Sequence, residues 1–166
     1  VCFSLLELSI LYLLQRASKL ILEPGRSLVG NAGITVYTIG TIKELPTKTY
    51  LFVDGGMADN LRPMLYDATY SFALIQQSPK TETQTYTIAG KFCESSDILG
   101  KEVTLPVATP GDYLIVFSTG AYNYSMASNY NRARRPEMIL VDSKKIQTLV
   151  KRETWDHIIK LDNNLE

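Results

Sequence analysis

Short runs of β-branched and aromatic residues, separated by turn-forming residues, dominate the chain from residue 34 onward. Ile34–Ile42 is such a run, and a polar turn at Pro46 and Thr47 separates it from a second run, Thr49–Val53. Alternation of this kind is typical of strands with one buried face, and the intervening turn indicates a hairpin. Further runs of the same character lie at residues 71–77, 84–90, 102–107, 112–117, 137–142 and 146–151. Many short strands at this spacing predict a mainly β, antiparallel domain that is closed into a barrel or packed as a sandwich.

Length and composition are those of a globular domain. The 166 residues are 45% hydrophobic and 20% charged, enough for one domain with a sizeable core or for one domain and a fragment of another. Lys and Arg together number 17, as do Asp and Glu, so we expect neither nucleic acid nor a membrane as a partner. Cys2 and Cys93 cannot form a disulfide framework, and no Cys/His cluster indicates a metal site. A reduced, cytoplasmic setting is therefore expected.

The first 14 residues form an apolar segment in which leucine and isoleucine recur with helical spacing. The segment is too short to span a membrane, Glu7 interrupts it, and it lacks the basic leader of a secretory signal. We expect a helix that is buried or that awaits a partner, and a chain that is a piece of something larger.

The motif Glu-Pro-Gly-Arg at residues 23–26 ends a short apolar run, Lys19–Leu22. A strand that ends in an acid, a proline, a glycine and a base is where α/β proteins place ligand contacts. The same four residues also fit a plain strand-to-helix turn with solvated charges, so both interpretations stay open. Ser27 is positioned to cap a short helix running to residue 32.

Arg62 and Tyr66 are four residues apart, so on a helical turn they share one face. A guanidinium and a phenol on one face can hold a carboxylate, through a charged pair and an added hydrogen bond. The alternative is a surface arginine stacked on a tyrosine, without a ligand.

Cys93 lies in the stretch Gly90–Asp97, after a strand-like run and directly before Glu94. A neighbouring carboxylate disfavours the thiolate, so this cysteine suits a proton donor better than a nucleophile. The alternative is a half-buried strand cysteine without chemistry, since free cysteine is among the most buried residue types.

Polar and charged side chains dominate the region after residue 120. Residues 120–131 are dense in hydroxyls and amides, which can bind a polar ligand or satisfy one another in a loop. The arginines at positions 132, 134 and 135 predict a solvated face or an interface patch. A helix is predicted at residues 155–161 with Thr154 as its cap, and His157 in it is expected to be a surface or packing residue.

Four motifs, at residues 23–26, 54–66, 90–97 and 120–131, occur in an order that closely resembles the C-terminal part of the diaminopimelate decarboxylase family. That family belongs to the fold-type III pyridoxal-phosphate enzymes, and Cys-Glu-Ser at residues 93–95 is similar to its diaminopimelate branch rather than to ornithine decarboxylases, which carry a Cys-Asp form. The resemblance implies decarboxylation of meso-2,6-diaminopimelate, a small amino acid, to L-lysine and CO2, with pyridoxal 5'-phosphate as cofactor. It also implies three segments: an atypical leader at 1–18, a remnant of the cofactor-binding TIM-like (β/α)8 barrel at 19–45, and a C-terminal β-barrel or β-sandwich domain at 46–166.

The same resemblance implies roles for residues of the first two motifs. Glu23 would face the pyridine nitrogen of the cofactor and keep it protonated, with Gly25 beside it. Arg26 would bind a substrate carboxylate near the cofactor. Arg62 and Tyr66 would complete the grip on the distal end of the substrate, which agrees with the clamp inferred from their spacing.

The later motifs would supply the remaining groups. Cys93 would donate the proton to the carbon that loses CO2, and Glu94 would contact the distal amino group of the substrate. Tyr122 would lie near the cofactor phosphate and the substrate. In this family the cysteine and the glutamate reach into the active site of the neighbouring subunit, which implies a homodimer with shared sites.

One family feature has no counterpart in this sequence. The lysine that binds the cofactor covalently belongs to the family's barrel strands, and Lys19 is in the wrong place to replace it. We therefore expect a truncated or mis-started reading of a longer gene, inactive by itself. The alternatives are a non-catalytic β-domain, or half of a split enzyme that docks on a separate barrel chain. A decarboxylase for lysine, arginine or ornithine is disfavoured, because those substrates lack the distal carboxylate that the Arg62 clamp would hold.

Overall fold

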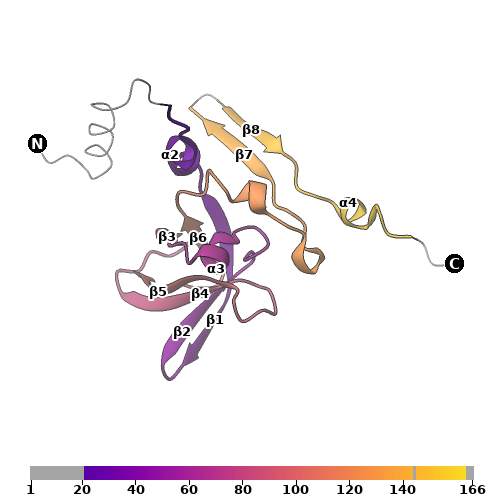
Figure 1. Ribbon diagram of the computed structural model, residues 1–166. Coiled ribbons are helices and arrows are strands. Elements are labelled where there is room, and N and C mark those ends of the chain that lie inside the picture. Colours follow the sequence, from indigo (N-terminus) through magenta and orange to yellow (C-terminus); the bar gives the residue numbers. More distant parts are fainter. Residues whose placement is uncertain (1–20, 144, 164–166) are drawn as a thin grey trace, which may run out of the picture.

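The computed structural model describes residues 21–143 and 145–163 (Figure 1). The leader predicted at residues 1–18, and Lys19, lie outside the described residues. Among the described helices, none is long and apolar enough to cross a membrane.

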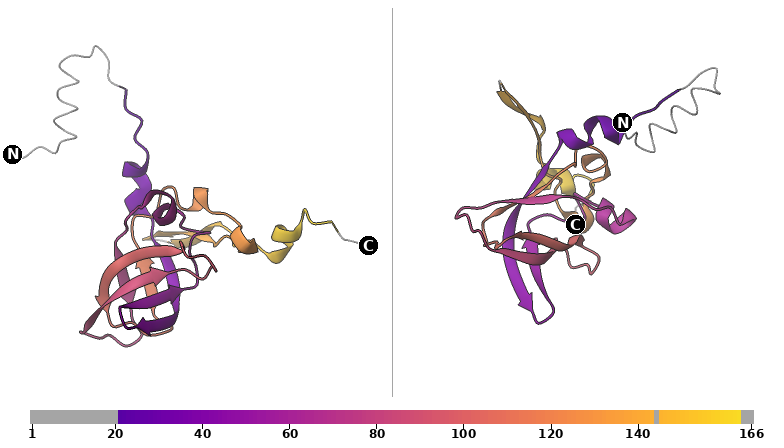
Figure 2. Two further views of the ribbon diagram at one scale, coloured as in Figure 1. Left: turned by 60° about the horizontal axis from the view of Figure 1, so that its bottom comes forward. Right: turned by 90° about the vertical axis from the view of Figure 1, so that its left-hand side faces the viewer.

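Six strands form one sheet that wraps around the core, as both views in Figure 2 show. The strands are β1 (Thr35–Leu45), β2 (Lys48–Val53), β3 (Phe72–Ile75), β4 (Thr83–Ala89), β5 (Ile98–Pro106) and β6 (Tyr113–Val116). Their order is β3-β6-β1-β2-β4-β5. All neighbours are antiparallel except β2 and β4, whose parallel pairing is reached through the long connection that carries helix α3 (Arg62–Tyr66) and β3. The mainly β prediction is confirmed, and the antiparallel prediction is wrong for this one pair.

The two edge strands of this sheet, β3 and β5, contact each other, so the sheet is nearly closed into a barrel. The contact depends on Gly100 in β5, since a Cβ built there would lie 2.9 Å from ring carbons of Phe72 in β3. Glycine weakens a strand signal in sequence, yet it is required where another element approaches this closely. This explains why the sequence predicts β5 only from residue 102, whereas the strand begins at Ile98.

Alternating residues of the strands fill the barrel. In β2, for example, Leu51 and Val53 are buried while their neighbours are partly exposed, and β6 repeats the pattern with Leu114 and Val116. This is the period-2 pattern that predicted the strands. The buried cluster is Tyr37, Ile39, Leu51, Val53, Tyr86, Ile88, Leu99, Leu105, Ala108, Leu114 and Val116.

The segment before β1 forms helix α2 (Arg26–Val29) and a 3-10 turn, η1 (Gly30–Ala32). Ser27 was expected to cap this helix, and that prediction is wrong. The carbonyl of Gly25 already accepts a hydrogen bond from the Leu28 amide at 3.0 Å, so the helical turn begins earlier and Ser27 lies inside it.

β1 is a central strand of the sheet, paired with β2 on one side and β6 on the other. Its residues 35–45 fall within the segment that the sequence assigns to the barrel remnant. We propose that the boundary between the remnant and the sheet domain lies near Gly33, because a strand with two partners in the sheet belongs to the sheet's folding unit.

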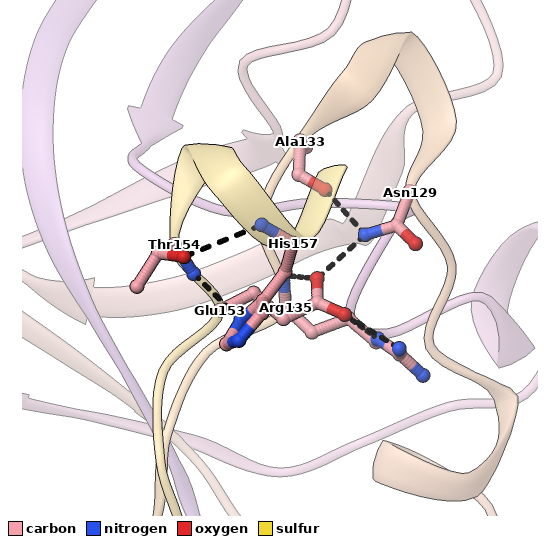
Figure 3. Close-up of polar contacts among 6 residues, drawn as sticks. All are labelled: Asn129, Ala133, Arg135, Glu153, Thr154 and His157. Atoms are coloured by element: carbon pink, nitrogen blue, oxygen red, sulfur yellow. Dashed lines mark hydrogen bonds and ion pairs between the residues drawn. The ribbon is translucent and has the colours of Figure 1, made fainter. Parts of the chain in front are cut away.

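The C-terminal part consists of a hairpin, β7 (Met138–Asp142) and β8 (Lys145–Val150), and helix α4 (Trp155–Ile159), which Figure 1 shows to one side of the barrel. Thr154 caps α4 as predicted. Its hydroxyl accepts from the His157 amide, and the His157 ring accepts from the Thr154 amide (Figure 3). The exposed His157 is therefore a surface residue of the cap.

A polar network fixes the segment before α4 to the loop of residues 129–135 (Figure 3). Glu153 accepts hydrogen bonds from the Arg135 side chain and amide and from the Asn129 amide group. The Arg135 bond is the main reason why the pKa of Glu153 falls to about 2. Arg132 pairs with Asp162, so each of these two arginines has an acidic partner within the chain.

Candidate active site

Arg62 lies between two tyrosine rings. As predicted, it shares a helical face with Tyr66, because both belong to α3, and its guanidinium carbon lies 5.2 Å from the Tyr66 ring centroid. The same carbon is 5.5 Å from the ring centroid of Tyr122, which is 60 positions later. Stacking on rings occupies the faces of a guanidinium and leaves its N–H edges free to donate. Its Nε is buried and has no hydrogen-bond partner among the described residues, which is rare for a buried donor.

The Glu-Pro-Gly-Arg motif meets this cluster. A Cβ built on Gly25 would lie 3.3 Å from the Tyr122 hydroxyl oxygen, so the two residues are close neighbours. The Arg26 guanidinium lies 5.7 Å from the ring centroid of Tyr70, whose hydroxyl donates to the Asn123 side-chain oxygen at 3.4 Å. Glu23 lies in the exposed extended segment just before α2.

Tyr122 itself has a backbone φ of 60°, in the left-handed region that bulky residues rarely adopt. Such conformations persist where the surrounding structure holds them, and they are common in ligand sites. The strained turn brings the Tyr122 ring onto Arg62 and its hydroxyl toward Gly25.

Cys93 is exposed on a loop, so its alternative interpretation as a half-buried strand cysteine is wrong. β4 ends at Ala89, and the chain then turns sharply before β5. Glu94, the residue after Cys93, accepts a 3.4 Å hydrogen bond from the Tyr130 hydroxyl. The loop borders a groove of about 460 Å³ whose lining includes Lys91, Cys93, Arg132, Arg134, Arg152 and Trp155.

The expected site residues thus form two groups. The first group is joined by contacts with tyrosine rings and hydroxyls and consists of Gly25, Arg26, Arg62, Tyr66 and Tyr122. The second group, Cys93 and Glu94, lies on the loop that follows β4. Within the described residues, no hydrogen bond or ion pair joins the second group to the first. Nor does any cluster of three His, Cys, Asp or Glu side chains in that part of the chain suit a metal ion.

Asp97 is a buried acid that the sequence did not single out as a functional residue. It is 2% exposed, and its carboxylate accepts from the amides of Met57 at 2.8 Å and Phe92 at 3.0 Å. Burial raises the pKa of this carboxyl, and the two amide bonds oppose that effect. The sequence signal that was available is its position at the end of the motif 90–97. Gly56 and Gly90, the two glycines against its carboxylate, come together around it only in the folded chain.

A partly buried acid, Asp59, supports the loop that leads to α3. It accepts from the Tyr37 hydroxyl and from the Gly56 amide. Burial raises the pKa of Asp59 to about 6, although both hydrogen bonds act in the opposite direction. Burial, and next the negative charge of Asp59, raise the pKa of Tyr37.

Replacing Tyr37 with phenylalanine is therefore expected to destabilise the chain more at about pH 8 than at about pH 4.5. Because folding raises the pKa of Asp59 above 3.8, its contribution to stability is complete below that value and is lost as pH rises through about 6. Above that pH the Tyr37 hydroxyl solvates a buried charge, and its loss should cost about 2 kcal/mol, against about 1 kcal/mol for a neutral partner. Urea unfolding at the two pH values measures the difference.

Tyr86 offers a matched control. It is equally buried, but its hydroxyl pairs with the neutral Gln84 side chain and the Ala108 amide. Tyr86→Phe should cost the same free energy at both pH values, and an equal pH dependence in the two variants would contradict the role of Asp59.

Two buried asparagines were also not foreseen. Asn60 is completely buried, and within the described part of the chain neither of its side-chain amide atoms has a partner. The side-chain amide nitrogen of Asn123 is also without a partner there. Buried amides without partners are rare in folded proteins. Both residues lie in motifs 54–66 and 120–131, whose loops contact each other through the hydrogen bond from the Ser128 amide to the Ala58 carbonyl at 2.8 Å.

The fold and these two groups of residues define a β-barrel domain whose loops present arginines, phenols and a thiol. Residues 10–120 match the model of the pyridoxal-dependent decarboxylases, specifically their C-terminal sheet domain, and the chain belongs to that family.

Relatives agree with this assignment. The chain is 51% identical over 145 residues to the diaminopimelate decarboxylase of Synechocystis sp., covering 87% of this chain and 31% of the relative. It is 51% identical over 142 residues to that of Bacillus subtilis, covering 85% and 32%. The chain therefore spans about a third of the length of these relatives.

Two solved structures differ in how similar they are to this chain. Diaminopimelate decarboxylase from Methanocaldococcus jannaschii, in complex with L-lysine, superimposes with a TM-score of 0.83 at 38% identity, covering 96% of this chain and 37% of that one. A lysine/ornithine decarboxylase from Vibrio vulnificus, complexed with cadaverine, gives a TM-score of 0.60 at 25% identity, covering 68% and 31%. The chain is thus more similar to the diaminopimelate branch than to this lysine/ornithine enzyme.

Proposed function

We propose that this chain supplies the substrate grip and the proton donor of a diaminopimelate decarboxylase, which converts meso-2,6-diaminopimelate to L-lysine and CO2. The observation that carries the proposal is Arg62, stacked between Tyr66 and Tyr122, with a buried Nε that has no partner in residues 21–143 and 145–163. A carboxylate is the acceptor such a guanidinium suits best, and it binds through two parallel hydrogen bonds. A distal carboxylate distinguishes diaminopimelate from lysine, ornithine and arginine.

The residues present fit the pyridoxal phosphate on which the family depends. Two guanidiniums, phenol hydroxyls and an exposed glutamate offer partners for a phosphate, a carboxylate and a pyridinium nitrogen. Pyridoxal phosphate, when bound, accepts the electron pair of the bond that breaks as CO2 leaves. Glu23 would hold a proton at the pyridine nitrogen, and Gly25 and Tyr122 would border the cofactor.

The remaining roles follow from the two groups of residues. Arg26, Arg62 and Tyr66 bind and orient the substrate through the carboxylate that it keeps. Glu94 receives the distal ammonium group. The Cys93 thiol gives its proton to the carbon that has lost CO2, which then becomes a methylene.

The separation of the two groups favours a homodimer with shared sites. Cys93 and Glu94 are exposed on their loop, where a neighbouring subunit can meet them. In this arrangement each active site takes its thiol from one protomer and its arginines from the other. A cytoplasmic location is part of the same proposal.

A split enzyme is the second candidate, and one observation favours it. Ile21, Leu22 and Leu28, ahead of β1, are 63–69% exposed, which leaves an apolar surface where the family's barrel would dock. Docking on a separately made barrel chain would cover these side chains equally well.

The test is a chimera that joins the N-terminal part of the Bacillus subtilis relative to residues 19–166 of this chain. We expect it to release CO2 from meso-diaminopimelate and not from lysine, ornithine or arginine. The isolated 166-residue chain with pyridoxal phosphate should release none, because it lacks the covalent lysine. Turnover by the isolated chain, or a preference of the chimera for lysine, would contradict the proposal.

A further inference from the structure

One carboxylate joins the two loops that carry the candidate active-site residues. Asp97 Oδ1 accepts from the Met57 amide at 2.8 Å, in the loop that leads to α3 and Arg62. Asp97 Oδ2 accepts from the Phe92 amide at 3.0 Å, the residue directly before Cys93. The backbone adds a third link, because the Lys91 amide donates to the Gly55 carbonyl at 2.9 Å.

The surroundings of this carboxylate leave no room for another arrangement. A Cβ built on Gly56 would lie 2.6 Å from both of its oxygens, and one built on Gly90 would lie closer still, with Oδ2 the nearest atom. Each loop therefore contributes a glycine that allows its backbone to approach the carboxylate. With both sides in contact, a shift of one loop must displace Asp97 and through it the other loop.

A comparison with Asp112, another buried acid, shows which property of Asp97 is specific to the site. Asp112 is 1% exposed and accepts from the amides of Gln77 and Thr109 and from the Thr109 hydroxyl. It has the same burial and the same kind of partners, but these lie in turns that carry none of the candidate site residues. Both acids stabilise turns, and only Asp97 bridges the two loops of the site.

We propose that Asp97 is a positioning residue that couples the Arg62 loop to the Cys93 loop, and so fixes the position of the Cys93 thiol relative to Arg62 of the same chain. If the sites are shared between subunits, the coupling passes from one active site of the dimer to the other, since Cys93 and Arg62 of one chain then serve different sites. The inference rests on the proposed function of Cys93 and Arg62, whereas the coupling itself is a property of the chain.

The first measurement uses the unaltered 166-residue chain. Amide hydrogen exchange of Met57 and Phe92 should show equal protection, because the two amides donate to the two oxygens of one carboxylate and become free in the same opening event. Protection that differs by more than about tenfold would mean that the loops open independently, and would overturn the coupling.

The second measurement uses Asp97→Asn. Asparagine has the same size but only one acceptor oxygen, so its NH2 group faces one of the two amides. We expect faster exchange at both Met57 and Phe92, and a changed rate of alkylation of Cys93 by iodoacetamide, measured with Cys2 replaced by serine. In the chimera, kcat for meso-diaminopimelate should fall by about ten- to a hundredfold, because misplacing a reacting group by about 1 Å can have such an effect.

Asp112→Asn is the matched control. It should destabilise the chain to a similar extent without altering Met57 exchange, Cys93 alkylation or kcat. Faster exchange in Asp97→Asn with an unchanged kcat would overturn the positioning role and leave a structural one. A chimera that is inactive before any substitution would count against the proposed function, while the exchange and alkylation results would still decide the coupling.

Discussion

Replacing Cys93 with alanine is expected to lower kcat of the chimera by about 10²- to 10⁴-fold, the usual contribution of a positioned proton donor. Without the thiol, water must protonate the carbon that has lost CO2. KM should change little, because the substrate is held by Arg26, Arg62 and Tyr66. Steady-state kinetics with meso-diaminopimelate measure the effect, and the reaction in D2O adds a second readout. The unaltered protein should place deuterium on one face of the new methylene, and Cys93→Ala should place it on both.

Ser96 provides the control, since it lies on the same exposed loop and its hydroxyl makes no hydrogen bond within the described residues. Ser96→Ala should leave kcat unchanged. An equal loss in both variants would indicate a disturbed loop rather than a lost proton donor, and full activity in Cys93→Ala would remove the thiol from the reaction.

The shared-site arrangement gives this variant a further use. Cys93→Ala and Arg62→Met, each nearly inactive at substrate concentrations well below KM, should regain activity under those conditions when they are mixed and allowed to exchange subunits. A mixed dimer then contains one site with both substitutions and one site with neither. Absence of recovery, with subunit exchange confirmed, would place both residues in the same protomer's site.

Replacing Arg62 with methionine is expected to raise KM for meso-diaminopimelate by about a hundredfold, the loss of about 3 kcal/mol from a two-point charged contact. The reason is that the guanidinium is held between two rings and its buried Nε finds no acceptor among the residues that the structure describes. Arg62→Lys should recover little, because an ammonium cannot form two parallel bonds to a carboxylate. Discrimination between meso-diaminopimelate and lysine should shrink in both variants.

Lys48 is the matched control for the stacking. Its ammonium lies 5.2 Å from the ring centroid of Tyr50, at the exposed end of the β1–β2 hairpin. Lys48→Met removes a cation from a tyrosine ring without touching the cluster, so KM should not change. A large effect on kcat with an unaltered KM in Arg62→Met would show that the arginine does not grip the substrate in the ground state.

Local patterns were sufficient wherever one segment decides its own structure. Each run with alternating side chains became a strand, because a period of two places every second residue on one face whatever the partner strand is. Arg62 and Tyr66 share a face because four residues complete about one helical turn. The Thr154 cap likewise depends only on residues within one turn of α4.

The order of the motifs indicated the protein family, which side-chain periodicity cannot do. The four motifs at 23–26, 54–66, 90–97 and 120–131 indicated the family before any geometry was known, and the family assignment is confirmed. The placement of Gly25, Arg26, Arg62, Tyr66 and Tyr122 in one cluster agrees with that resemblance, while their individual roles await the kinetic tests.

Sequence reasoning failed at three places. These are the interpretation of Cys93 as a half-buried strand residue, the predicted cap at Ser27 and the predicted first residue of β5. In each case a distant contact or one earlier backbone bond decided the outcome. The cysteine is exposed because the chain turns around Asp97 after β4, and β5 begins early because Gly100 admits the ring of Phe72. The approach of Phe72 to Gly100 joins residues 28 positions apart, so it is not visible in a local stretch of sequence.

The sequence by itself determined the strands, the short helices and the family, because these follow from side-chain periodicity and motif order. Only the tertiary structure decided the parallel pairing of β2 with β4, the stacking of Tyr122 on Arg62, the contact of Tyr37 with Asp59 and the burial of Asp97. A carboxylate is buried only where donors from other segments compensate its lost hydration, and those donors come together only when the barrel closes.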